Sequence, residues 1–225
     1  MVRVARSLAL TALVLVLAPL TATATPEPPF HSSIRPLSPQ TRAELRGRFW
    51  HSGCPVALSQ LRVLRVVTVG FDDGVQTGQL VVNRDVAAPL VRVFRRLYKL
   101  RFPIRHMRLA DMYGPKSAQP KDRDVSGSFS CRQAVPSPCS GGTGTGTWSN
   151  HAYGHAIDLN PVENPYVGCG MTRDPKARSY MDRSKRRPGM VTPAVVRAFR
   201  SIGWGWGGAW TGSTKDYMHF SVNGH

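Results

Sequence analysis

The chain has 225 residues, 41% of them hydrophobic, and it carries 30 lysines and arginines against 13 aspartates and glutamates. The formal charge of +17 indicates polyanionic partners, and the length is compatible with one globular domain. The sequence contains no internal repeats, which excludes a repeat array. After an N-terminal apolar run, no apolar segment is long enough to cross a membrane, which excludes a multispan membrane protein.

Residues 1–24 are predicted to form a secretory signal peptide. Arg3 and Arg6 provide its positive start, Ser7 to Leu20 an apolar run, and Ala22-Thr-Ala24 a cleavage site of the A-x-A type. The apolar run is shorter than the about 20 residues of a membrane span. We therefore expect an exported protein that begins near Thr25, with a retained membrane anchor as the lesser alternative.

The next residues, 25–45, contain several prolines and are predicted to be a flexible linker. The domain itself is expected to span residues 46–225. A short helix is predicted over Thr41 to Trp50, at the junction of the two.

Local patterns predict most of the later elements. Valine-rich stretches on either side of Asp72-Asp-Gly74 predict a β-hairpin. Asp85 opens a predicted helix that runs to about Leu100, with an apolar stripe that belongs to the core. The remaining predictions are an extended segment over Phe102 to Met107, a strand over His155 to Leu159, and a helix from Thr192-Pro193 to Gly203.

Two short stretches near the C-terminus carry the chemistry, Ser149-Asn-His-Ala-Tyr-Gly-His-Ala-Ile-Asp158 and Asp216-Tyr-Met-His-Phe220. A catalytic zinc site uses three protein ligands and leaves the fourth position to water. His151, Asp158 and His219 would make such a set. Asp216 is a spare carboxylate beside a ligand, which suits a general base.

His151 and His155 are four residues apart, the spacing that places two ligands on one face of a helix. Gly154 between them and Asn160-Pro161 just after them favour instead a loop that turns into a short strand. Side chains alternate along a strand, so His155 and Asp158 would face opposite sides. We therefore expect His155 to be a surface residue or a neighbour of the ligands.

The pattern S-x-H-x-x-G-x-A-x-D followed by D-x-x-H-F resembles the VanY-type group of zinc D-alanyl-D-alanine carboxypeptidases and L-alanyl-D-glutamate endopeptidases, which act on peptidoglycan and share a fold with the hedgehog signalling domain. Further stretches that resemble the group are Gly53-Cys-Pro55, Phe71-Asp-Asp-Gly74, Phe102-Pro-Ile104, Phe129-Ser-Cys-Arg132, Asn160-Pro161, Asn164-Pro-Tyr166 and Gly203-Trp-Gly-Trp-Gly-Gly208. The resemblance covers roughly Trp50 to the C-terminus. It implies an α+β fold in which a small antiparallel sheet carries the zinc site and helices pack on one face.

By position, the resemblance gives His151, Asp158 and His219 as ligands of Zn²⁺, and Asp216 as the base. It also gives Arg132, in F-S-C-R where the group more usually has F-N-C-R, a role in holding a substrate carbonyl or carboxylate. A fixed guanidinium is chemically suited to that role.

Three other residues are candidates for substrate binding: Ser149, Tyr153 and Trp206. Trp206 is one of three tryptophans among glycines just before Asp216. Of the other two, Trp204 is expected to support the core, and Trp210 is left open between core packing and a wall of the substrate cleft.

In an exported protein, the four cysteines are candidates for two disulfides. Four cysteines allow three pairings, and the residues alone do not choose among them. The resemblance favours Cys54 with Cys131, which leaves Cys139 with Cys169. A structural zinc site made of all four is a poor alternative because the chain has no C-x-x-C pair.

The resulting hypothesis is a monomeric zinc metallopeptidase, secreted or held in a bacterial cell wall, that cuts peptidoglycan stem peptides at a bond that the motifs leave open. The alternatives are a non-catalytic, zinc-stabilised wall-binding module and a basic exported protein that binds nucleic acid or heparin-like polymers. Anionic wall polymers are expected partners, and no motif indicates specific nucleic-acid binding. Much of the excess charge lies between Arg173 and Arg187, a loop-like run that is either a solvated insertion or part of the surface that attracts polyanions.

Overall fold

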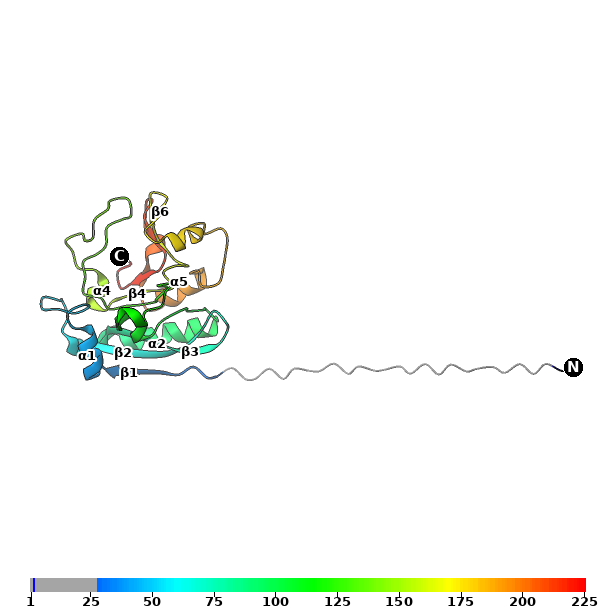
Figure 1. Ribbon diagram of the computed structural model, residues 1–225, viewed down its shortest axis with the longest axis horizontal. Coiled ribbons are helices and arrows are strands. Elements are labelled where there is room, and N and C mark those ends of the chain that lie inside the picture. The colour runs from blue at the N-terminus through cyan, green and yellow to red at the C-terminus, as the bar shows by residue number, and fades with distance from the viewer. Residues whose placement is uncertain (1, 3–27) are drawn as a thin grey trace.

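The computed structural model describes residue 2 and residues 28–225, and its elements form two layers (Figure 1). The features that predicted a signal peptide, from Arg3 to Ala24, lie outside the described residues. No helix in the described part of the chain combines the length and the apolar character that a membrane crossing requires.

The first layer is built on the predicted hairpin. Strand β2 (Leu61–Val69) pairs antiparallel with β3 (Val75–Asn83), and their register joins Leu61 to Asn83 and Val69 to Val75. The turn lies where Asp-Asp-Gly predicts it: Gly74 donates its backbone N–H to the Asp72 carboxylate at 3.0 Å, and Asp73 has a φ of 61°. Strand β1 (Ser32–Pro36) pairs antiparallel with the free side of β2 and completes a three-stranded sheet.

The segment predicted to be a flexible linker, residues 25–45, therefore contains ordered elements, namely β1 and the helix α1 (Pro39–Leu45). Its prolines occupy tolerated positions. Pro36 is the last residue of an edge strand, and Pro39 opens α1 directly after Ser38, whose hydroxyl accepts the N–H of Thr41 at 3.1 Å. Burial of Leu37 and Leu45 anchors the segment. The folded domain thus begins before residue 46, and the short helix begins and ends earlier than predicted.

Helix α2 (Arg84–Lys99) covers the hairpin, and α5 (Pro193–Arg200) packs against α2. The predicted apolar stripe of α2 is buried, with Leu90 and Phe94 at 0% and 1% exposure. Helix α5 begins at Pro193 as predicted, where the Thr192 hydroxyl accepts the N–H of Val195 at 3.4 Å. The helical residues end at Arg200, and Gly203 follows in the left-handed region with a φ of 84°.

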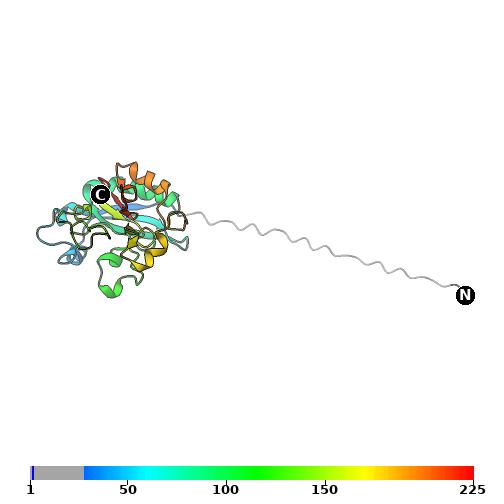
Figure 2. The same ribbon diagram turned by 90° about the horizontal axis from the view of Figure 1, so that it is seen from above.

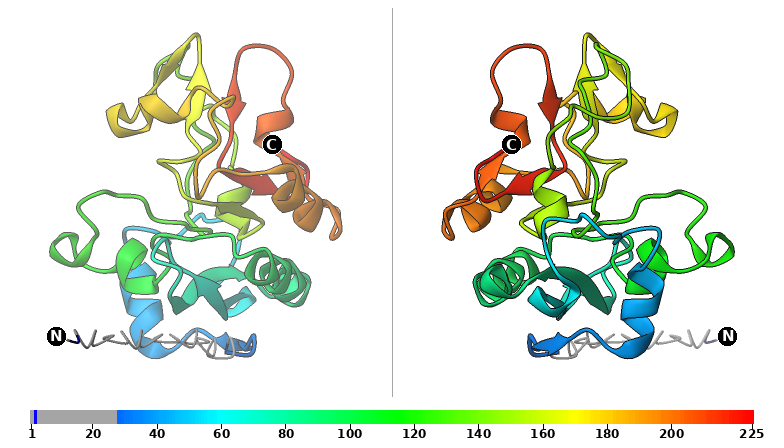
Figure 3. Two further views of the ribbon diagram at one scale, coloured as in Figure 1. Left: turned by 90° about the vertical axis from the view of Figure 1, so that its right-hand side faces the viewer. Right: turned by 90° about the vertical axis from the view of Figure 1, so that its left-hand side faces the viewer.

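The second layer contains two small antiparallel sheets that lie over the first. The side views (Figure 3) and the view from above (Figure 2) show this arrangement. One has the order β4 (Ala156–Asp158), β9 (His219–Ser221), β7 (Gly205–Trp206), and the other the order β6 (Met171–Thr172), β5 (Tyr166–Gly168), β8 (Lys215–Asp216). The α+β prediction is confirmed, with three small sheets among the described residues where one was expected. Short helical segments lie in the connections between the larger elements: η1 (Leu58–Gln60), α3 (Leu109–Tyr113), η2 (Lys116–Ala118), α4 (Asn150–Tyr153), η3 (Pro175–Tyr180) and η4 (Gly207–Ala209).

Apolar packing joins the layers. Ile157 from β4 and Phe220 from β9 are fully buried in the same cluster as the apolar face of α2. Phe220 also stacks on Phe199 of α5, with the ring centroids 3.9 Å apart. Trp204 belongs to this cluster at 4% exposure, which confirms its expected supporting role.

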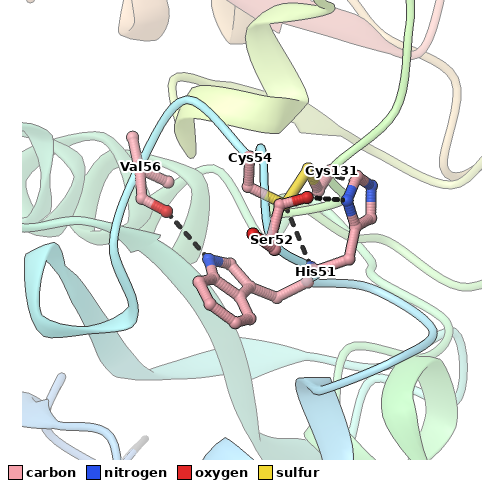
Figure 4. Close-up of a disulfide and its surroundings, with 6 residues drawn as sticks. His51, Ser52, Cys54, Val56 and Cys131 are labelled. Carbon is pink, nitrogen blue, oxygen red and sulfur yellow. Dashed lines mark hydrogen bonds between the residues drawn. A yellow bond between two sulfur atoms is a disulfide. The ribbon is translucent and has the colours of Figure 1, made fainter.

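Both disulfides favoured by the resemblance are present, Cys54 with Cys131 and Cys139 with Cys169. The first lies beside His51, whose backbone N–H contacts the sulfur of Cys54 at 3.1 Å (Figure 4). Because the two bonded cysteines are 77 residues apart in sequence, this bond ties the segment after α1 to the chain that leads into Arg132.

Candidate metal centre

Three elements bring His151, Asp158 and His219 together. His151 lies on the one-turn helix α4, which Ser149 caps by accepting the N–H of His151 at 3.2 Å. Gly154 ends this helix with a φ of 68° and leads the chain into β4. Asp158 and His219 then lie directly opposite each other in the β4–β9 register. The expected turn at Gly154 and the strand after it are present, but His151 lies on a short helix rather than in a loop.

The three side chains converge on one point. Nε2 of His151 lies 3.2 Å from Nδ1 of His219, and the two oxygens of Asp158 lie 3.1 Å from His219 and 3.2 Å from His151. Zinc–ligand bonds of about 2.0–2.1 Å in a tetrahedron separate the ligand atoms by about 3.3 Å. The observed spacing is close to that value, and two imidazoles with one carboxylate are donors that zinc accepts. The residues present therefore fit a zinc ion.

Backbone carbonyls fix which nitrogen of each ring faces the centre. Nδ1 of His151 lies 2.6 Å from the carbonyl oxygen of Ser128, and Nε2 of His219 lies 3.2 Å from that of His225. A ring nitrogen that donates to a carbonyl carries the proton, which leaves the other nitrogen free to bind a metal. Both rings are thus held in the tautomer that a metal ligand needs.

The electrostatics of the cluster favour a cation at its centre. Burial opposes ionisation of Asp158, but the two histidines outweigh it and hold the pKa of Asp158 well below its usual range. Burial lowers the pKa of His151, which keeps that ring neutral. Burial acts in the same direction on His219, but the hydrogen bond to Asp158 prevails and raises its pKa. A metal ion bound among these three side chains would supply the positive charge that Asp158 favours.

Asp216, the predicted base, lies on β8 beside this cluster. Its Oδ1 atom is buried and has no hydrogen-bond partner in the described part of the chain. Burial, and then the charge of Asp158, raise the pKa of Asp216 to about 7. The carboxylate is therefore close to the ligands, is not engaged by them, and can exchange a proton near neutral pH.

The cluster opens into a small cavity of about 160 Å³ that includes Arg132, Ser149 and Asp216 among its lining residues. Arg132 follows the Cys54–Cys131 disulfide, donates to the carbonyl of Gln133 at 3.2 Å, and is partly exposed. Its positive charge adds to the fall in the pKa of His151 and partly opposes the rise in the pKa of Asp216. Arg132 thus lies in the wall of the cavity that contains the three candidate ligands.

The other sequence candidates lie elsewhere. Tyr153 and Trp206 are not among the described residues that line this cavity. Tyr153 stacks on His155, with centroids 6.2 Å apart, and Trp206 donates its indole N–H to the carbonyl of Tyr217 at 2.9 Å. His155 precedes β4 rather than lying on the strand, and its Nε2 is 3.0 Å from the carboxylate of Asp85; it is not among the described residues that line the cavity.

Three lining residues with ring side chains were not among the candidate site residues: Tyr166, Trp210 and His225. Trp210 stacks on the ring of His225 with centroids 5.8 Å apart, and meets Tyr166 edge-on at 6.2 Å. The sequence gave a partial signal for two of them, since Tyr166 lies in a stretch shared with the resembled group and Trp210 was a possible cleft wall. Nothing in the sequence singles out His225.

A comparison with protein-family models matches residues 143–222 to the family described as D-alanyl-D-alanine carboxypeptidase. The match is less than half of the chain, but it includes all three candidate ligands and Asp216, while Arg132 lies outside it. Neither the curated proteins nor the solved structures gave a match.

Proposed function

We propose that this chain, whose residues 143–222 form a domain of the D-alanyl-D-alanine carboxypeptidase family, is a secreted zinc peptidase acting on the stem peptides of bacterial peptidoglycan. The observation that carries the proposal is the convergence of His151, Asp158 and His219 beside a buried carboxylate oxygen of Asp216 that has no partner among the described residues. A closed structural metal site uses a fourth protein ligand and needs no spare base.

Zinc, when bound, supplies Lewis-acid polarisation of the attacking water and of the scissile carbonyl. Asp216 accepts a proton from that water as it attacks the amide carbon, and then delivers the proton to the leaving nitrogen. A pKa of about 7 suits both steps, because the group must gain and lose a proton in each turnover. Arg132 donates hydrogen bonds to the developing oxyanion or to a substrate carboxylate.

The size of the cavity favours the end of a peptide. Its volume of about 160 Å³ is below the range of about 300–1,000 Å³ that is usual for sites enclosing a whole small molecule. We therefore expect removal of a terminal D-alanine first, with cleavage inside the stem peptide as the alternative.

The test is digestion of purified muropeptides by the zinc-loaded protein, with mass spectrometry of the products and a chelator-treated sample. Loss of one alanine that the chelator abolishes is the expected result, and paired internal fragments would establish an endopeptidase instead. Bound zinc with no product from any muropeptide would contradict the proposal and favour a wall-binding module.

The base assignment is tested with Asp216→Asn, which keeps the shape of the side chain but cannot take a proton. We expect kcat to fall by about 10²–10⁴-fold while zinc stoichiometry, measured by atomic emission, stays unchanged. Asp182→Asn, the same substitution at an exposed carboxylate, is the matched control and should retain full activity. Equal turnover by both variants would show that Asp216 is not the base.

A further inference from the structure

A second open cavity, of about 500 Å³, lies beside the loop that leads from η3 to α5 and against the tryptophan of β7. In Figure 1 this loop leaves the body of the molecule after η3 and returns at α5. Its walls contain four arginines, Arg183, Arg186, Arg197 and Arg200, together with the rings of Trp206 and Tyr217. No aspartate or glutamate is among the described lining residues.

The positive charges of this arginine cavity meet no neutralising carboxylate among residues 28–225. In the described part of the chain, no carboxylate lies within ion-pair distance of any of the four guanidinium groups. Arg183 is half-buried and is held by neutral acceptors, the carbonyl of Glu163 at 2.7 Å and the side-chain oxygen of Asn164 at 3.0 Å. It also lies over the ring of Tyr217, 4.6 Å from the centroid. This part of the loop-like run is therefore fixed against the protein.

Burial lowers the pKa of Arg183 to about 10, and the positive charges of Arg186 and Arg187 act in the same direction. Like charges held around one cavity repel each other, and an anion placed between them removes that repulsion. The cavity is thus prepared for a negatively charged ligand.

The shape of the basic surface indicates the class of ligand. Arg197 also lines a neighbouring hollow between α2 and α5, where Arg96 and Lys99 add two further charges and again no acidic residue is present among the described lining residues. A ligand that follows this path must carry anionic groups at intervals. Guanidinium groups match phosphate oxygens in a two-pronged geometry, which favours phosphate as the anionic group.

We propose that the arginine cavity binds successive phosphate groups of a soluble phosphodiester polymer. Binding here requires the arginines alone, so it can succeed or fail independently of amide hydrolysis at the metal centre. The three arginines other than Arg183 are exposed, and their side chains donate no hydrogen bond to the described residues, so these side chains are free to close on a phosphate.

The experiment measures binding of poly(glycerol phosphate) to the zinc-loaded chain by titration calorimetry at about 0.1 M salt, where the Debye length of about 10 Å suppresses long-range attraction. The test variant is Arg186→Gln with Arg200→Gln, one substitution on each wall. The matched control is Arg35→Gln with Arg84→Gln, two exposed arginines outside the cavity with the same change in net charge. Circular dichroism melting and muropeptide digestion verify that both variants are folded.

We expect the Kd of the test variant to rise by roughly tenfold or more, because charge-assisted contacts to phosphate are lost, and that of the control to change by less than about twofold. Equal weakening by both variants would overturn the proposal, since net charge alone would then explain binding. Absence of polymer binding would overturn it as well. A final arm uses phosphatidylglycerol vesicles with phosphatidylcholine vesicles as reference: cavity-dependent binding to the lipid alone would assign the site to a membrane headgroup and refute a soluble polymer.

Discussion

Replacement of Gly154 by alanine is expected to destabilise the fold and weaken the metal centre together. Gly154 has a φ of 68°, and an added Cβ would lie 2.6 Å from the backbone nitrogen of Asn83 and 3.2 Å from the carbonyl carbon of Val82. Both are backbone atoms of β3, and the Asn83 nitrogen already donates to the Gly154 carbonyl at 3.1 Å. The clash therefore cannot be relieved by a side-chain rotation.

Two costs combine at this position. A residue with a Cβ in the left-handed region costs about 1–2 kcal/mol, and overpacking against a fixed neighbour costs about 1–3 kcal/mol. The free energy of unfolding should therefore fall by about 2–5 kcal/mol. Gly203→Ala is the matched control, because Gly203 also follows a helix with a φ of 84° but has no atom within 4 Å of an added Cβ.

The assay is urea unfolding of the metal-free chain followed by circular dichroism, together with zinc affinity from competition with a chelating dye. The control should show the first cost alone, so the two variants should differ by about 1–3 kcal/mol. Only Gly154→Ala should weaken zinc binding, because Gly154 lies between His151 and Asp158 and sets their relative position. Equal loss of stability in both variants would refute the contact argument, and unchanged zinc affinity would refute the positional one.

Three further predictions concern stability. Burial raises the pKa of Asp124 from 3.8 to about 8, so between these pH values the folded chain holds a proton that the unfolded chain has lost. The free energy of unfolding should therefore fall from pH 4 to pH 8, by at most about 1.4 kcal/mol per pH unit. Asp124→Asn should flatten this dependence in unfolding experiments at several pH values. Replacing the Cys54–Cys131 disulfide by two serines should lower the free energy of unfolding by about 4–5 kcal/mol, and replacing Cys139–Cys169 by about 3–4 kcal/mol, because the first disulfide closes the longer loop. The reverse order in denaturant titrations would contradict the loop-entropy argument. Zinc at about 1,000 times its Kd should stabilise the chain by about 4 kcal/mol, and a chelator should remove this gain in a thermal melt.

Local sequence patterns were sufficient for the elements that local forces determine. The alternation of valines around Asp72-Asp-Gly74 predicted β2 and β3, and the apolar stripe of α2 predicted which face is buried. Strand β1 was not predicted, because its prolines suggest a linker and its stability comes from hydrogen bonds to β2, some thirty residues away in the register of Ser33 with Arg65. Pairing between distant segments leaves little trace in the sequence of either one.

The convergence of the three candidate ligands could be predicted because their chemistry is rare and their spacing is short within each motif, whereas the groups that orient them could not. The carbonyls of Ser128 and His225 hold the two imidazoles, and a backbone carbonyl is available at every residue. Trp210 lines the cavity because the C-terminal segment of the chain folds around that cavity. Such contacts depend on the backbone path, which a motif does not encode.

What converts the two motifs into one site is the register of β4 with β9. Asp158 and His219 are 61 residues apart in sequence, yet they face each other because Ile157 and Phe220 are paired at the next position, on the opposite face. Both of these apolar side chains are fully buried, and Phe220 stacks on Phe199. A slip of one residue would turn Phe220 toward the metal centre and His219 into the core. Apolar packing on one face of this strand pair therefore sets the distance between the two candidate ligands on the other face.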